Sequence, residues 1–193
     1  MKCKRFVASL LIAALCVLML PLQVFAAETV ASGTCGADLT WRLDENGTLI
    51  ISGTGKINDY ASGATPWYSY RKTIKAISIE DGVTGIGKYA FDHCSEITDI
   101  VIPDSVVSID NRSFNWCENL ELVVIGSAVE SIGTYGFAYC KKLKCVVIPE
   151  TMKTIGSNAF ISANLTDVYY AGTNAAWNAN LIEGSNEVLD SVN

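Results

Sequence analysis

The segment SIGTYGFAYCKKLKCVVIP, residues 131–149, has a near copy earlier in the chain, GIGKYAFDHCSEITDIVIP, at residues 85–103. Both segments have an isoleucine and a glycine at their second and third positions. Aromatic residues and a cysteine follow, and an apolar run then stops at proline. Two such similar segments indicate an internal repeat, and a repeat determines the fold class before any single residue does.

The repeat has a constant period of 23 residues. Apolar residues keep this step in five columns: Phe91, Phe114, Phe137 and Phe160; Ile86, Ile109, Ile132 and Ile155; Cys94, Cys117 and Cys140; Ile100, Val123 and Val146; Ile102, Ile125 and Ile148. A fixed period in this range is typical of a solenoid, in which each repeat forms one coil stacked on the previous coil.

Apolar alternation predicts one short parallel strand in each coil. In LKCVVIP we expect Leu143, Val146 and Ile148 to point inward and Pro149 to end the strand. Equivalent strands are predicted over 74–79, 97–102, 120–125 and 165–170, about 4.8 Å apart in one continuous sheet. On the return side, the glycine column (Gly87, Gly133, Gly156), with Asp110 in that place once, is predicted to form a tight, left-handed turn.

The segment before the repeats predicts a cap. LTWRLDENGTLIIS, residues 39–52, has the alternation of a β-hairpin, with Asn46-Gly47 suited to a type I′ turn. Such a hairpin would cover the open edge of the first coil. The predicted organisation is a signal peptide over 1–26, a hairpin cap and linker over 27–70, repeats over 71–170, and a C-terminal cap or tail over 171–193.

The N-terminus predicts export from the cell. Basic residues at positions 2, 4 and 5 precede an uncharged apolar run over 6–20, and Val24 and Ala26 supply a cleavage site before Ala27. The alternative is an uncleaved membrane anchor, for which the apolar run is short. We therefore expect an extracellular or cell-surface protein with no membrane segment after cleavage. Cleavage makes the formal net charge of −6 more negative by three, which argues against nucleic-acid partners.

Residues that could support catalysis or bind a metal have simpler explanations in the repeat. Five cysteines follow the predicted cleavage site, and we favour a ladder of buried thiols over a disulfide or a metal site, because parallel side chains one coil apart bridge poorly. His93, the single histidine, occupies the column of Trp116 and Tyr139. SGTGK, residues 52–56, lacks the spacing of a phosphate-binding loop. We predict no enzyme activity, no cofactor and no metal.

Two surfaces are candidates for binding. The outward side of the strands is the candidate partner-binding surface, formed by Asp99, Val101, Leu122, Val124, Val147 and Tyr169. The alternative is that β-branched residues there simply suit strands. On the return side, a column of rings is the candidate glycan-stacking surface, formed by His93, Trp116 and Tyr139. The alternative for this column is packing between coils.

The repeat pattern C-x-x-L-x-x-V-x-I-P-x-S-V-x-x-I-G-x-x-A-F resembles the BspA-like, or Treponema-type, leucine-rich repeat of bacterial surface antigens. Residues 35–60, 66–91 and 168–182 are similar to segments of secreted members from gut Firmicutes. The resemblance implies a leucine-rich-repeat solenoid with a parallel sheet on one face and short helical or 3-10 turns on the other. It also implies a non-catalytic binding or adhesion module of Gram-positive origin, and it brings no catalytic residues.

These observations together predict a secreted or cell-surface module that binds a protein or a host-surface ligand through its sheet face. The alternatives are a glycan-binding module that uses the aromatic column, and a structural component of a surface layer.

Overall fold

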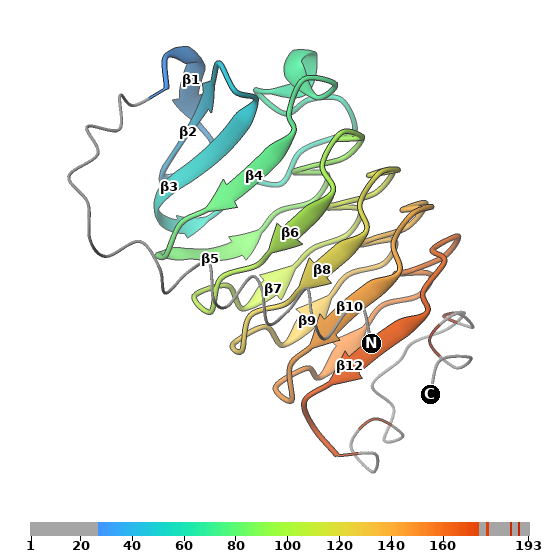
Figure 1. The fold of residues 1–193 in the computed structure, drawn as a ribbon. Coiled ribbons are helices and arrows are strands. Elements are labelled where there is room, and N and C mark those ends of the chain that lie inside the picture. The colour runs from blue at the N-terminus through green and yellow to red at the C-terminus, as the bar shows by residue number, and fades with distance from the viewer. Residues whose placement is uncertain (1–26, 174–176, 178–185, 187–188, 190–193) are drawn as a thin grey trace, which may run out of the picture.

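The protein is a β-solenoid whose coils stack along one axis beneath a β-sheet cap (Figure 1). The structure, a computed structural model, describes residues 27–173 together with Trp177, Asn186 and Leu189. The predicted signal peptide over 1–26 lies outside the described residues. Within the described residues, no helix has the length and hydropathy needed to cross a membrane.

The cap contains three antiparallel strands: β1 (Thr29–Thr34), β2 (Asp38–Asp44) and β3 (Thr48–Lys56). The predicted hairpin is confirmed as β2 and β3, and Leu39, Trp41 and Leu43 are buried as their alternation indicates. The first strand was not predicted, because its sequence has no apolar alternation and most of its residues are exposed.

The predicted type I′ turn between β2 and β3 is wrong. That turn requires positive φ at both central residues, but in this loop only Gly47 has one, at 84°. Three residues connect the strands instead, and the carboxylate of Asp44 accepts hydrogen bonds from the backbone N–H groups of Asn46 and Thr48 at 3.0 and 2.8 Å. Asp44 thus holds the longer turn closed.

Each coil contributes two strands rather than one, so the solenoid has two parallel sheets. The first, here called the strand wall, contains β6 (Asp99–Val101), β8 (Leu122–Val124), β10 (Cys145–Ile148) and β12 (Asp167–Tyr170). The second wall contains β5 (Val83–Ile86), β7 (Ser108–Ile109), β9 (Ser131–Ile132) and β11 (Thr154–Ile155), and joins the cap through β3. Two-residue strands are too short to show alternation, so the sequence did not predict them.

The first coil belongs partly to the cap. Its strand β4 (Ala76–Ile79) pairs with β3 in parallel and is not part of the four-stranded sheet. A short 3-10 helix, η1 (Tyr68–Tyr70), precedes β4.

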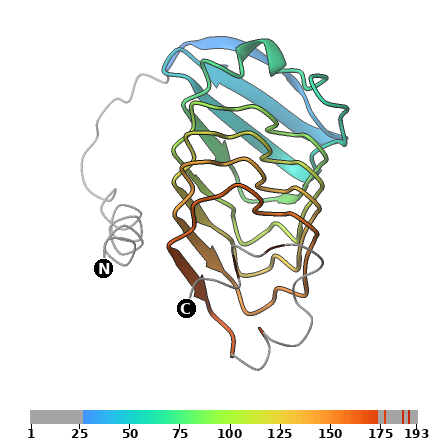
Figure 2. The same ribbon diagram turned by 90° about the vertical axis from the view of Figure 1, so that its right-hand side faces the viewer.

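Turns, rather than the expected short helices, form the third side of each coil, here called the return wall (Figure 2). Backbone hydrogen bonds join these turns from coil to coil, for example from Phe91 N–H to Ser113 O at 2.7 Å and from Phe114 N–H to Gly136 O at 2.8 Å. Non-glycine residues at two positions per turn have a positive backbone φ, between 58° and 62°: Tyr89, His93, Arg112, Trp116, Tyr135, Tyr139, Asn158 and Ser162. This backbone cannot continue as a helix, because a right-handed helix needs negative φ throughout.

The predicted role of the glycine column is also wrong. Gly87, Gly133 and Gly156 do not have positive φ; the left-handed residues follow two and six positions after them. Glycine is needed there because the neighbouring coil is close: a Cβ atom on Gly87 would lie 2.1 Å from Asn58 O.

A spine of buried aromatic rings runs through the centre of the solenoid. The ring centroids of Phe91 and Phe114 lie 5.1 Å apart, those of Phe114 and Phe137 5.0 Å, and those of Phe137 and Phe160 5.5 Å. Trp67 continues the spine into the cap, stacked 5.8 Å from Phe91 and donating its indole N–H to Ala90 O at 2.9 Å. The linker part of the predicted segment over 27–70 therefore contains a core residue.

At the far end of the described coils, a side chain rather than a backbone carbonyl bonds to the last spine residue. In earlier coils each spine phenylalanine donates its N–H to a backbone carbonyl of the next coil, whereas Phe160 N–H lies 3.3 Å from Asn186 Oδ1. The Asn186 amide also donates to Gly156 O at 3.0 Å, and Leu189 is 1% exposed. An amide side chain has the same donor and acceptor as a peptide group, so Asn186 can imitate the next coil.

The left-handed turns predict an unusual order of stability at Arg112. Both Arg112→Gly and Arg112→Val remove the guanidinium group, but a β-branched residue tolerates positive φ poorly. We expect the valine variant to have a free energy of unfolding about 1 kcal/mol below that of the glycine variant in urea denaturation. Thr134, which does not have positive φ, is the control, and there valine should be the more stable. Equal stabilities for the two Arg112 variants would contradict the conformational assignment.

Candidate functional site

The outward residues of the strand wall form two rows in exact register. One row contains Val101, Val124, Val147 and Tyr169, each paired with the next across neighbouring strands. The other contains Asp99, Leu122, Cys145 and Asp167. Parallel pairing places side chains of one row about 4.8 Å apart, so each row is a continuous strip.

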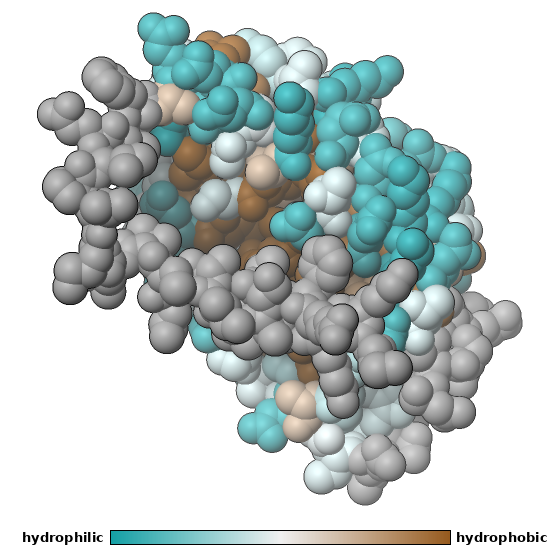
Figure 3. All heavy atoms as spheres, in the orientation of Figure 1, coloured by the Kyte–Doolittle hydropathy of each residue, from teal (hydrophilic) through white to brown (hydrophobic). Residues whose placement is uncertain are grey.

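The first row is largely accessible. Val101 is 44% exposed, and Val124, Val147 and Tyr169 are half-buried. Figure 3, in the orientation of Figure 1, shows apolar residues over β4 and β6 between hydrophilic margins. These four residues are the accessible apolar members of the predicted partner-binding surface, and their role in binding stays a prediction.

The second row differs from the prediction at its centre. Asp99 is exposed and Asp167 half-buried, but Leu122 is only 6% exposed. Leu122 and Cys145 pack with Val124 and Tyr169 into a small apolar cluster separate from the main core. The strand wall therefore carries apolar side chains on both of its sides.

The rings of the return wall stack on one another. The centroids of His93 and Trp116 lie 5.9 Å apart with planes 10° from parallel, and those of Trp116 and Tyr139 lie 4.6 Å apart at 17°. Lys141 lies 5.1 Å above the Trp116 ring and pairs with Glu118 at 2.7 Å. Since both faces of Trp116 contact other rings, this arrangement favours packing between coils; glycan stacking stays a prediction.

A second column, which the sequence analysis missed, lies beside the first. The guanidinium carbon of Arg112 lies 4.4 Å from the ring centroid of Tyr135 and 5.9 Å from that of Tyr89. A cation between two ring faces stabilises both contacts. Tyr89, Arg112 and Tyr135 are 23 residues apart in the sequence, but a column that contains both tyrosine and arginine was not recognised as one set.

His93 belongs to a polar cluster at the start of the return wall. Its Nδ1 lies 3.0 Å from Oδ1 of Asp92 but makes no hydrogen bond. The Asp92 carboxylate accepts hydrogen bonds from Asn115 Nδ2 and Ser62 Oγ, both at 2.9 Å. Asp92 is 4% exposed, and these two donors replace hydrogen bonds with water that its carboxylate loses on burial. Ser62 donates to Asp92 rather than to His93, and so it is not activated as a nucleophile would be.

The predicted thiol ladder is confirmed for the repeat column. Cys94, Cys117 and Cys140 are free and buried, as is Cys35 in the cap. Cys117 and Cys140 donate their S–H groups to Phe91 O and Phe114 O at 3.3 and 3.2 Å. Burial raises the pKa of Cys94 to about 12 and that of Cys35 to about 11, which keeps both thiols protonated. In the described part of the chain, no three His, Cys, Asp or Glu side chains are placed to hold a metal ion.

Comparison with known families identifies the repeat. Residues 66–188 match the BspA type leucine rich repeat region in six copies. The chain therefore belongs to the BspA-type leucine-rich repeat family, as its sequence pattern predicted. A comparison with curated proteins found no match.

Solved structures show the same fold. A leucine-rich repeat protein from Eubacterium ventriosum is 26% identical with a TM-score of 0.55, over 73% of this chain and 44% of that one. A leucine-rich repeat protein from T. pallidum is 26% identical with a TM-score of 0.50, over 70% and 71% of the two chains. One from Bacteroides ovatus is 27% identical with a TM-score of 0.50, over 68% and 39%. This chain thus spans less than half of the first and third proteins, and the predicted fold class is confirmed.

The buried thiols predict strong protection from alkylation. At mildly alkaline pH, iodoacetamide should modify Cys94, Cys117 and Cys140 more slowly in the native protein than in guanidinium chloride, by a factor of about 10³ or more, because reaction requires unfolding. Peptide mass spectrometry measures each site separately. A cysteine introduced at exposed Lys142 is the control and should react at once in the native protein. Rapid native labelling of Cys117 would contradict its place between coils.

Proposed function

We propose that this chain is a non-catalytic binding module of the bacterial cell surface that recognises an extracellular protein through the strand wall. Its family membership supports a surface or protein-interaction role, and stacked repeats present extended surfaces suited to such binding. This role requires no catalysed reaction.

The observation that carries the proposal is the in-register apolar row from Val101 to Tyr169. Its residues lie on the outer side of the sheet, where they do not contribute to the main core, and Val101 is among the most exposed large apolar residues described. A contiguous apolar strip on a surface is typical of an interaction site. The rings of the return wall, by contrast, stack largely on one another.

The margins of the strand wall suggest the kind of protein that fits. Asp99 and Asp167 lie at the two ends of the second row, with Leu122 between them. An apolar centre with acidic ends is complementary to an apolar partner surface flanked by basic residues. The negative formal charge of the whole chain favours the same partners during encounter.

Two valines of equal exposure provide a matched test. Val101 on the strand wall and Val107 beside the second wall are both 44% exposed. In a capture experiment with extracellular host proteins, followed by surface plasmon resonance on the captured protein, we expect Val101→Lys and Val147→Lys to weaken binding at least tenfold. Val107→Lys should bind like the unaltered chain.

Four results would contradict this proposal. Unchanged affinity in both strand-wall variants would remove the wall from the interface. An equal loss in Val107→Lys would indicate a general effect of charge. Retention on a glycan array that is lost in Trp116→Ala, or self-association without a foreign partner, would favour the glycan-binding or surface-layer function instead.

A further inference from the structure

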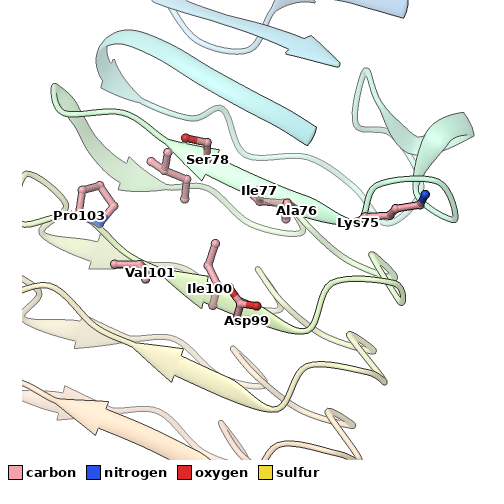
Figure 4. Close-up of a pocket in the computed structure, with 9 residues that line it drawn as sticks. Lys75, Ala76, Ile77, Ser78, Asp99, Ile100, Val101 and Pro103 are labelled. Carbon is pink, nitrogen blue, oxygen red and sulfur yellow. The ribbon is translucent and has the colours of Figure 1, made fainter. Parts of the chain in front are cut away.

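The strand wall has an opening between β4 and β6 (Figure 4). The hydrogen-bonded sheet ends at β6 on one side, and β4 pairs only with β3 on the other. Every other neighbouring pair of coil strands in the described residues is joined by a ladder. The opening is therefore a local interruption of an otherwise continuous surface.

The interruption is confined to this wall. On the second wall β3, β5 and β7 remain paired, with one shift in register between Gly55 and Lys56. Inside the solenoid the ring centroids of Phe91 and Phe114 remain 5.1 Å apart. Strand β3 explains the difference, because its nine residues pair first with β4 and then with β5. Strand β4 follows this cap strand along its whole length and so is not hydrogen-bonded to its neighbour β6.

Backbone hydrogen-bonding groups line both sides of the opening. On β4 the even-numbered residues bond to β3, as in Glu80 N–H to Ile51 O at 3.0 Å. Successive peptide groups of a strand alternate in direction, so those of Ile77 and Ile79 face the opening. On β6 the bond from Ile102 N–H to Val124 O at 2.8 Å likewise leaves the groups of Asp99 and Val101 facing it.

These four residues have unused donors and acceptors. No hydrogen bond to their peptide groups across the opening occurs among the described residues. An unpaired backbone group is stable only where water or a ligand can reach it. The opening thus provides the edge groups that an extended peptide uses when it binds to a sheet.

The opening has an apolar floor, and Lys75, Ser78 and Asp99 are among the residues that line it. Ile77, Ile79 and Ile100 form the floor and are 9%, 8% and 1% exposed. The volume of the opening is about 260 Å³, and an apolar cavity of about 150 Å³ already accepts benzene. The floor therefore suits one large apolar side chain, and the polar groups in the lining suit the peptide groups on either side of it.

We propose that the opening receives one apolar side chain of leucine or phenylalanine size, presented by an extended segment of the partner protein. A peptide group next to this side chain bonds to accessible backbone groups at the rim of the opening. The opening lies beside Val101, at the end of the apolar row, so the partner's contact with the row continues into it. This inference rests on the proposed function and specifies how the partner is anchored.

Small model peptides test the opening directly. The probes are N-acetyl-leucine methylamide, which has two peptide groups and an apolar side chain, and N-acetyl-glycine methylamide, which lacks the side chain. With isoleucine methyl groups labelled for NMR in the full chain, the leucine probe should shift the signals of Ile77, Ile79 and Ile100 saturably. The expected dissociation constant is on the order of mM, and the glycine probe should bind at least tenfold more weakly.

A substitution that fills the opening is the second part of the test. Ala76 is exposed on β4 and lines the opening. Ala76→Phe should abolish the leucine-induced shifts, whereas Ala64→Phe, at an exposed site in the linker, should leave them unchanged. If circular dichroism shows that Ala76→Phe does not fold, Ser78→Phe on the same strand takes its place.

The outcomes separate this inference from the proposed function. Absence of saturable shifts, equal shifts with the glycine probe, or shifts that persist in the filled variants would overturn the inference. A partner that binds the Ala76→Phe chain normally, yet is lost in Val147→Lys, would also overturn it while the proposed function stands. If the leucine probe binds in the opening but no extracellular protein binds the chain, the opening is a site for an apolar side chain and the proposed protein-binding function is wrong.

Discussion

This structure depends on the contacts between successive coils, which consist of backbone hydrogen bonds and stacked phenylalanine rings. A single coil has two very short strands and a turn, too little to bury its own apolar side chains. Against a neighbour, the same coil forms ladders on two walls and three backbone bonds on the third, and its phenylalanine packs about 5 Å from the next. Stability therefore comes from nearest neighbours, and both ends need caps. The β1–β3 sheet with Trp67 closes one end, and Asn186 satisfies the last spine residue at the other.

The same contacts determine what each surface can do. On the return wall, left-handed residues direct N–H groups toward the next coil, and their side chains are brought into columns where they stack. That wall uses its aromatic rings largely for its own cohesion. The strand wall places side chains at the same spacing, but β-branched residues there leave atoms exposed. Where β4 pairs with the cap instead of β6, backbone groups also become accessible. The strand wall, and above all its break between β4 and β6, is therefore the surface whose groups are least used in contacts between coils.

The sequence predicted the features that repeat and missed those that depend on contact between coils. Period and column chemistry were enough for the solenoid, the buried phenylalanines, the thiol ladder and the cap hairpin. The second wall was missed because two residues per coil cannot show alternation, and the column around Arg112 because its members differ in chemistry. The glycine column was assigned to a left-handed turn, although the close approach of Asn58 to Gly87 is what excludes a side chain. The break at β4 depends on how the cap packs, which no periodicity records.

The most direct test of the account is a measurement of contacts between the spine rings by NMR in the folded chain. With selectively labelled phenylalanine, nuclear Overhauser effects should connect Phe91 to Phe114, Phe114 to Phe137, and Phe137 to Phe160, each pair being neighbours at 5.0 to 5.5 Å. Rings two coils apart should show none. Missing contacts between Phe114 and Phe137, or contacts that skip a coil, would contradict the stacked solenoid and with it both the strand wall and the opening at its edge.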